Sequence, residues 1–338
     1  MTSSFRPNSV KLEQNGLPIG GGVFMNDMPV REGPVLVLGS SGMDIIGRPH
    51  HELLQGSSSP GTLRFASGGV ARNVAENLAR LGMEAVLFSA VGDDPEGRNL
   101  LEKTAESGVD ISPCLIEPEA KTGAYLAVLD QNGSLHIAID SMSAASAITP
   151  AYLQKFHQTF KKASAVFLDA NLSPKALRSA VKLARRYNTP IAADPTSTVL
   201  APQLKPLLKD LWLITPNIAE AEILCPMPDP EKDSSQVIAT AKSLVSSGVE
   251  IVIITMAEFG LGYATVAQSG HVPAVKTEIL DPTGASDALT AAMLFSLLNG
   301  IPVDEAARLG AAAASLTLRT PGSVVPDLSL ELLYDQLL

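Results

Sequence analysis

The spacing of hydrophobic and polar residues changes several times along the chain. The most regular feature of this pattern is a set of short apolar runs. Runs of this kind occupy residues 35–39, 84–92, 165–170, 190–194 and 251–255, and they are rich in Val, Ile, Leu and Ala. Because apolar residues follow one another without alternation, both faces of each run must be buried. These segments are therefore predicted to be strands of a sheet that is covered on both sides.

Amphipathic segments with a helical period separate these runs. Val70, Val74, Leu78 and Leu81 recur three or four residues apart, and Gly82 follows as a C-terminal stop. In the second half of the chain, strand and helix patterns alternate, which implies right-handed βαβ crossovers and a mostly parallel sheet. The pattern predicts an α/β protein.

Three segments depart from this alternation. Residues 1–33 are rich in Asn, Pro, Ser and Gly without a sustained period, and they are predicted to form a flexible arm. Residues 51–66 are expected to be an exposed hairpin, and residues 122–140 a second hairpin that turns at Asn132-Gly133.

Most of the predicted strands are followed by a residue that can bind a ligand or shape a turn. The residues expected just beyond a strand are Asp44, Asp169, Asp194, Asn217, Ala257 and Asp281. The carboxyl ends of parallel strands meet at one edge of a sheet, where ligands bind in this class of fold. This convergence favours an enzyme over a purely structural module.

Composition and charge narrow the class of protein further. Apolar residues make up 46% of the 338 residues and aromatic residues only 4%, so Ala, Val, Leu and Ile must fill the core. A formal charge of −10 argues against nucleic acid or an anionic membrane as a partner, but not against a small anion bound by backbone amides. Two cysteines are too few for a disulfide framework or a cysteine-rich zinc site.

The sequence carries no signal-peptide pattern and no apolar run of about 18 residues. We therefore expect a cytoplasmic protein. Ser, Arg and Lys within the first dozen residues leave an organelle-targeting segment as an open alternative.

The segment DPTGASDALTAAM, residues 281–293, carries the most specific chemical signal. A helix that starts near Gly284 presents unpaired N–H groups and the positive end of its dipole, and small residues let an anion approach closely. Asp287 beside this cradle could accept a hydroxyl proton during phosphoryl transfer. The alternative is an ordinary acid that only stabilises the first turn. No Gly-Lys dipeptide occurs, which excludes a Walker-type P-loop.

Two stretches, GGVARNVAENLARLGMEAVLFSAVG and DPTGASDALTAAML, resemble the two signatures of the ribokinase-like, PfkB-type carbohydrate and nucleoside kinases. The positions that agree in the first are Gly68, Gly69, Asn73, Ala75, Gly82 and Gly92. The second departs from the family pattern only at Ser286. Within the family the chain is most similar to the pseudouridine kinases, through the first signature and through LDANLSPKAL and DPTS.

The resemblance covers roughly residues 34–330 and implies a kinase domain over residues 34–338. Its fold would be a three-layer α/β sandwich with a mostly parallel central sheet and a small β lid. Residues 51–66 and the hairpin 122–140 would form most of that lid, which shields the sugar and in this family often mediates dimers. A homodimer through the lid is therefore an expectation for this chain.

The resemblance also implies roles for individual residues. Asp287 corresponds to the catalytic base, which takes the proton from the attacking primary hydroxyl. The anion hole would be formed by the amides of Gly284, Ala285 and Ser286. The sugar would be bound by Asp44, Gly68, Gly69 and Asn73.

ATP and Mg²⁺ are the cofactors that the resemblance implies, with K⁺ as a further candidate. In TPNIAE, Asn217 and Glu220 match an Asn-x-x-Glu element that organises Mg²⁺ and its water around the phosphates. TMAEFG, with Thr255 and Gly260, resembles the turn beside the nucleotide. The residues that resemble part of a monovalent-cation site of some members are Asp281 and Thr283.

Two small residues stand where the family usually has glycine, Ser286 in the anion hole and Ala257 in the nucleotide turn. If position 286 needs a positive φ, serine adds strain of about 1 kcal/mol. If its φ is negative, serine keeps the amide and adds a hydroxyl that could contact the phosphate. Because Asp287 is intact, we expect an active enzyme.

Three functional hypotheses follow. The first is ATP-dependent phosphorylation of the 5′-hydroxyl of pseudouridine. The second keeps this chemistry and changes the acceptor to another nucleoside, ribose or a hexose. The third is a catalytically weak, kinase-like protein that binds a partner or ligand, which Ser286, Ala257 and the arm would favour and Asp287 disfavours.

Overall fold

The computed structural model describes residues 31–54, 56–131, 135–225 and 234–338. Most of the predicted arm and the predicted turn at Asn132-Gly133 lie outside the described residues.

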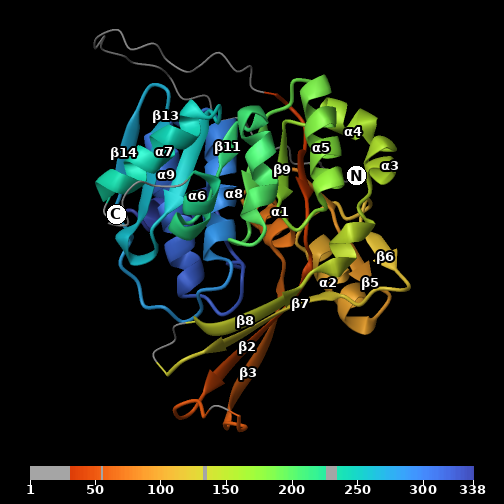
Figure 1. The fold of residues 1–338 in the computed structure, drawn as a ribbon, viewed down its shortest axis with the longest axis vertical. Helices are drawn as coiled ribbons and strands as arrows, with labels where there is room; N and C mark the ends of the chain where they lie inside the picture. Colours follow the sequence, from red (N-terminus) through yellow and green to blue (C-terminus); the bar gives the residue numbers. More distant parts are fainter. Residues whose placement is uncertain (1–30, 55, 132–134, 226–233) are drawn as a thin grey trace, which may run out of the picture.

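An eight-stranded sheet forms the centre of the described structure (Figure 1). In spatial order its strands are β14 (Ser269–Val272), β13 (Leu261–Thr265), β12 (Ile251–Thr255), β11 (Leu213–Ile214), β10 (Ile191–Asp194), β9 (Ala165–Asp169), β1 (Val35–Leu38) and β4 (Ala85–Phe88). The strands from β4 to β12 are parallel to one another. At the other edge, β13 is antiparallel to β12, and β14 is antiparallel to β13. The prediction of a mostly parallel sheet is confirmed.

Side chains of β1 alternate between two buried faces, which explains its continuous apolar sequence. Val35 and Val37 pack into one hydrophobic cluster, and Leu36 and Leu38 pack into the other. The first face is covered by α1 (Val70–Arg80), α8 (Ala285–Leu298), α9 (Val303–Leu318) and α10 (Leu330–Asp335). The second is covered by α3 (Pro150–Gln154), α4 (His157–Lys162), α5 (Pro174–Arg186), η2 (Ala201–Asp210), α6 (Ile218–Leu224) and α7 (Ser234–Ser246). The predicted three-layer sandwich is confirmed.

A second, four-stranded sheet extends away from this body (Figure 1). Its strands in order are β3 (Gly61–Gly68), β2 (Gly42–Pro49), β7 (Gly123–Leu129) and β8 (Leu135–Ser141). We call this four-stranded sheet the lid. Beside the base of the lid lie the helix α2 (Pro95–Glu106) and the two-stranded sheet of β5 (Ala90–Gly92) and β6 (Leu115–Glu117) (Figure 1). The short helix η1 (Ser143–Ala147) follows β8.

The lid differs in two ways from the sequence-based expectation. β2 ends at Pro49 and β3 begins at Gly61, so the hairpin is longer and begins earlier than the predicted 51–66. Asp44, expected in a turn after the first strand, lies inside β2, opposite Ala66 and beside Tyr125. The prediction of a turn was wrong because β2 is formed by pairing with two distant strands, which its own residues do not signal.

Candidate active site

Two helices on one face of the sheet, α1 and α8, bring the two sequence motifs together. The predicted helix start is confirmed: α8 begins directly after Gly284, which has a φ of 79°. A Cβ atom at this position would lie 2.1 Å from the carbonyl oxygen of Ser323, so glycine is required. Ala285 and Ser286 open the first turn, where backbone N–H groups have no acceptor within the helix.

Ser286 and Ala257, the two departures from the family pattern, differ in backbone conformation. Ser286 lies inside α8 and has no positive φ, so serine brings no left-handed strain. Ala257 has a φ of 48°, where a Cβ atom costs about 1–2 kcal/mol. The strain therefore lies in the candidate nucleotide turn and not in the candidate anion hole.

Asp287 is the central polar group of this site. Its side chain is buried, with an exposed fraction of 7%, and its Oδ2 accepts a hydrogen bond of 2.7 Å from Nδ2 of Asn73. Burial, together with the negative charge of Asp169, raises the pKa of Asp287 to about 7, although the Asn73 hydrogen bond and the Arg72 charge act in the opposite direction. A carboxylate with this pKa suits a general base at neutral pH.

Asp44 reaches the same site from the lid. It is 3% exposed, and within the described structure its Oδ2 has no hydrogen-bond partner. Burial, followed by the negative charge of Asp287, raises its pKa to about 7. A Cβ atom at Gly68 would lie 2.3 Å from this carboxyl group, and Gly69 has a φ of 96°. The glycine pair therefore leaves room for the buried carboxylate and for a ligand hydroxyl beside it.

Two further acids close the carboxyl-terminal edge of the sheet. Asp169 is fully buried and accepts hydrogen bonds from the Ser40 amide and hydroxyl and from the Ala71 amide, which fixes the start of α1. Asp194 has a strongly raised pKa, because it is buried and lies near the negative charges of Glu220 and Asp287. A bound cation would stabilise the charged form of Asp194.

The predicted Asn-x-x-Glu element is a helix cap in the structure. Asn217 accepts a hydrogen bond from the Glu220 amide, and Glu220 accepts one from the Asn217 amide, each of 2.9 Å. Burial raises the pKa of Glu220. Asn217 also bridges to Thr255 at the end of β12, so these two predicted residues adjoin each other. Gly260 follows with a φ of 93°, where a Cβ atom would lie 2.0 Å from the Val272 carbonyl oxygen.

These residues fit Mg²⁺ only in part. In the described ranges, no group of three or more His, Cys, Asp or Glu side chains is placed to hold a metal ion. Asp194 and Glu220 do provide hard carboxylate oxygens whose mutual repulsion a cation would relieve. This matches the habit of Mg²⁺, which keeps several waters and binds one or two carboxylates together with substrate phosphates.

Asp281 lies just before the anion-hole motif, in a segment that does not follow a strand as predicted. It is 2% exposed, and its two oxygens accept hydrogen bonds from the amides of Thr283 (3.0 Å) and Gly322 (3.1 Å). The guanidinium of Arg64, from β3 of the lid, forms an ion pair with the same carboxylate. This guanidinium supplies a positive charge at the carboxylate, and the monovalent-cation site expected at Asp281 and Thr283 stays a prediction.

Comparison with known proteins decides the family. Residues 34–329 match the model of the pfkB family carbohydrate kinases. The chain belongs to the PfkB family. It is 34% identical to the pseudouridine kinase of Escherichia coli over 297 residues, covering 88% of this chain and 94% of that one. It is 29% identical to the guanosine-inosine kinase of Exiguobacterium acetylicum, covering 87% and 97%.

A solved structure shows the same fold. An E. coli protein described as a ribokinase II, in complex with ATP and Mg²⁺, superposes with a TM-score of 0.77 at 20% identity, covering 90% of this chain and 99% of that one. The protein thus has a ribokinase-like fold, and as a PfkB kinase it is an ATP-dependent sugar or nucleoside kinase. Among the described residues, no helix is both long and apolar enough to span a membrane.

Sequence reasoning missed several residues of this PfkB site. Arg72 and Glu76 form a buried ion pair on α1, whereas Arg80 lies outside the site, is partly exposed and contacts Glu76 and Pro326. Their spacing of four residues is visible in the sequence, but on a helix it normally indicates a solvated face. Arg64 and Ser323 carry no local signal, because they reach the site from the lid and from the loop after α9.

The role of Asp287 can be tested against the alternative of an ordinary helix-start acid. Asp287→Asn removes the proton acceptor and keeps the size of the side chain, so we expect kcat to fall by about 10²–10⁴-fold with acceptor affinity largely retained. Asp304→Asn, in the first turn of α9, is the matched control and should leave kcat unchanged. Similar small losses in both variants would contradict the assignment.

The raised pKa values predict a pH dependence. Asp287 must be deprotonated to accept a proton, so kcat/KM should fall as pH drops below about 7 and level off above it. Asp44 titrates in the same range, so the acid limb should be steeper than that of one group and should flatten in Asp44→Asn. A limb centred near the ordinary aspartate value of 3.8 would contradict the burial argument.

Proposed function

We propose that this kinase transfers the γ-phosphoryl group of ATP to the 5′-hydroxyl of pseudouridine. The observation that carries the proposal is the 2.7 Å contact between Asn73 and Asp287, near an Asp44 oxygen that has no hydrogen-bond partner among the described residues. A candidate base, an amide and a carboxylate that could accept ligand hydroxyls are thus buried near one another, which supports this proposal. Similarity to a pseudouridine kinase over most of both chains supports the choice of acceptor.

The proposed mechanism uses each group for a separate task. Asp44 accepts hydrogen bonds from sugar hydroxyls, while Gly68 and Gly69 let the sugar approach the backbone. Asp287 takes the proton of the primary hydroxyl as it attacks the γ-phosphorus in line. The amides at the start of α8 stabilise the charge on the transferring group, aided by the positive end of the helix dipole.

ATP and Mg²⁺ serve as cofactors, and we assign their binding to the adjoining edge of the sheet. Thr255, Gly260 and Asn217 would bind the nucleotide, and Glu220 would bind Mg²⁺ through water. Bound Mg²⁺ would neutralise charge on the phosphates. The reciprocal hydrogen bonds between Asn217 and Glu220 hold both side chains at the start of α6.

Other acceptors are the main alternative, and the guanosine-inosine kinase relative gives them weight. The inner face of the lid offers Tyr125, which lies opposite Asp140 and near Asp44. These side chains are placed to contact whatever base or hydroxyl extends from the sugar. The third hypothesis, a weak binding protein, loses its support from Ser286, since that residue adopts an ordinary helical conformation.

A substrate panel tests the proposal. ADP release with ATP and Mg²⁺ should show a higher kcat/KM for pseudouridine than for uridine, guanosine, inosine, ribose or fructose. Asp287→Asn should abolish the signal, which excludes a contaminating kinase. Preference for another acceptor would retain the kinase chemistry and overturn the substrate. Nucleoside binding without any turnover would favour the binding protein.

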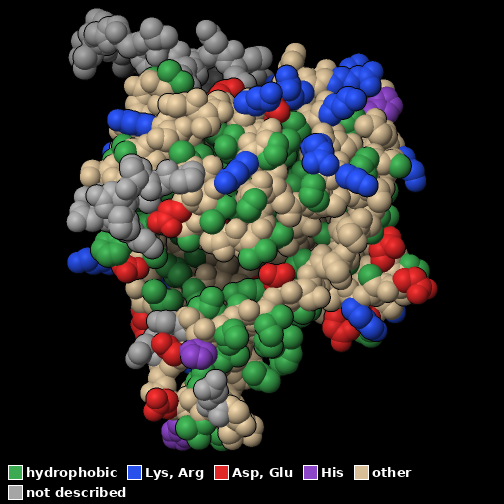
Figure 2. Space-filling model, viewed as in Figure 1, with side chains coloured by type: hydrophobic (Ala, Val, Ile, Leu, Met, Phe, Trp, Pro, Cys, Tyr) green, Lys and Arg blue, Asp and Glu red, His purple; other side chains and the backbone are tan. Residues whose placement is uncertain are grey.

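We also propose that the outer face of the lid is covered by the lid of a second copy. Along β3 and β8 the side chains that point away from the active site are large and exposed, namely Leu63, Phe65, Ile137 and Ile139. Figure 2 shows hydrophobic side chains gathered over the lid strands. One apolar face of a sheet is normally packed against another surface, so its exposure supports an interface.

The lid interface predicts a dimer in solution. Sedimentation should give about twice the mass of one chain for the wild type and the mass of one chain for Phe65→Asp, because a buried unpaired charge opposes association. Val266→Asp, an exposed apolar residue on the body, is the control and should remain dimeric. A monomeric wild-type protein at micromolar concentration would contradict the interface.

A further inference from the structure

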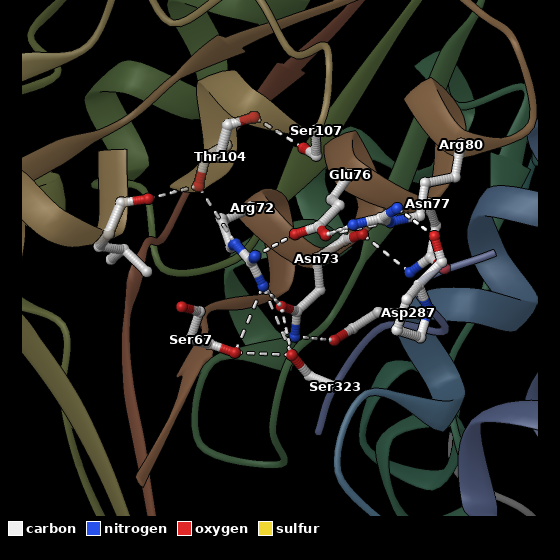
Figure 3. A network of polar contacts seen from close by, with 12 residues as sticks. Ser67, Arg72, Asn73, Glu76, Asn77, Arg80, Thr104, Ser107, Asp287 and Ser323 are labelled. Carbon is white, nitrogen blue, oxygen red and sulfur yellow. Dashed lines mark hydrogen bonds and ion pairs between the residues drawn. The ribbon is translucent and has the colours of Figure 1, made fainter. Parts of the chain in front are cut away.

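Of the lysines and arginines in the described part of the chain, Arg72 alone is buried, with an exposed fraction of 5%. It lies on α1 immediately before Asn73, and Figure 3 shows its guanidinium at the centre of a polar network. Burying a cation is costly unless it is paired and hydrogen-bonded. The contacts that offset this cost indicate what the residue does.

Each end of the Arg72 guanidinium contacts a different part of the site. Nη2 forms an ion pair with Glu76, and Nε donates to the hydroxyl of Thr104 on α2. Nη1 donates to the side-chain oxygen of Asn73 at 3.0 Å, and it also lies 3.3 Å from the carbonyl oxygen of Ser67 at the end of β3. Arg72 therefore connects α1 and α2 to the end of β3 in the lid.

The contact with Asn73 determines which way that amide faces. An amide side chain can be turned end for end, exchanging its oxygen and its NH₂ group. Because the Arg72 cation lies against one end, that end must be the oxygen, and the NH₂ group faces Asp287 (Figure 3). The reverse orientation would place the oxygen against the Asp287 carboxylate and the NH₂ against a guanidinium.

Ser323 joins the same network from the loop after α9. Its hydroxyl lies 2.6 Å from the Ser67 carbonyl oxygen, 3.0 Å from Asn73 Oδ1 and 3.5 Å from Arg72 Nη1. Its own carbonyl oxygen packs against Gly284, where no Cβ would fit. Through Ser323 the network extends to the first residue of the anion-hole motif.

We infer that Arg72, assisted by Ser323, is a positioning residue of the phosphoryl-transfer site that fixes the Asn73 amide against Asp287 and ties the lid end to the anion hole. The inference rests on the proposed role of Asp287 and assigns to the site a residue that does not contact the substrate. It gives the contact between base and amide a physical cause within this chain.

The positive charge of Arg72 also affects the pKa values of the acids around it. The charged groups that act on Asp287 are Arg72 of α1, Asp44 of β2, Asp169 of β9 and Asp194 of β10. Arg72 is the cation among them and lowers the pKa of both Asp287 and Asp44. Removing its charge should therefore raise the pH at which the base becomes active.

The test compares Arg72→Met with Arg80→Met. Both substitutions break an ion pair with Glu76, but Arg80 has no contact with Asn73. Arg72→Met should lower kcat by about 10–100-fold and move the acid limb of kcat/KM upward by about one pH unit. Arg80→Met should retain the wild-type limb and kcat. Equal pH limbs and similar kcat values in the two variants would overturn the inference.

Two milder variants cover the case in which Arg72→Met does not fold. Arg72→Lys keeps the charge and loses the planar set of donors, so the pH limb should stay in place while kcat falls. Ser323→Ala should lower kcat without moving the acid limb of kcat/KM, because it removes hydrogen bonds but no charge. Wild-type kcat in both variants would overturn the positioning role.

Binding separates this inference from the proposed substrate. Calorimetric titration with the acceptor that the panel selects should give a weaker Kd in Arg72→Met, by about tenfold or more, and an unchanged Kd in Arg80→Met. Turnover of an acceptor other than pseudouridine would refute the substrate alone. An unchanged Kd together with an unchanged pH limb in Arg72→Met would refute the positioning role alone.

Discussion

The hydrogen bond between Asn73 and Asp287 is the constraint on which the arrangement of this site depends. It joins residues 214 positions apart and requires both helices to start at fixed points beside the same edge of the sheet. Asp169 fixes the start of α1 through Ser40 and the Ala71 amide, and the tight packing of Gly284 against Ser323 fixes the start of α8. A displacement of either helix would separate the base from the amide. The contact therefore depends on the buried groups that hold the starts of α1 and α8.

Burial of acids determines the electrostatics of the site. Asp44, Asp194, Glu220 and Asp287 all have raised pKa values, with burial as the largest cause of each. A set of carboxylates kept out of water is unfavourable on its own, and its repulsion is reduced by protons, by a cation or by ligand hydroxyls. Arg72 and Arg64 offset part of this charge from within the chain. In the proposed mechanism, the remaining negative charge would favour hydroxyl donors and a metal-bound nucleotide.

A feature of the fold or of the site could be predicted when residues close together in the sequence determine it, and not when distant residues do. The helix at α1, the start of α8 and the parallel strands follow from local period, small residues and glycine, and all three were predicted. The strand at Asp44 requires pairing with β3 and β7, so its eight residues could not reveal it. The ion pair between Arg64 and Asp281 joins the lid to the body, and nothing near either residue indicates the other. Arg72 was overlooked for a different reason, since a charge on a helix usually faces solvent and only the packed structure shows that this one does not.

The small residues of DPTGASD illustrate how one motif combines requirements of different strictness. At Gly284 the positive φ and the nearby Ser323 carbonyl leave no space for a side chain, so the requirement is absolute. At Ser286 the backbone is already helical, and what the anion hole needs there is an N–H group, which any residue except proline supplies. Glycine at that position would serve only the close approach of an anion, and Ser286 keeps the N–H group that such an anion would contact. The departure at Ser286 is therefore compatible with the proposed phosphoryl-transfer chemistry, and the backbone strain lies instead at Ala257, the other departure from the family pattern.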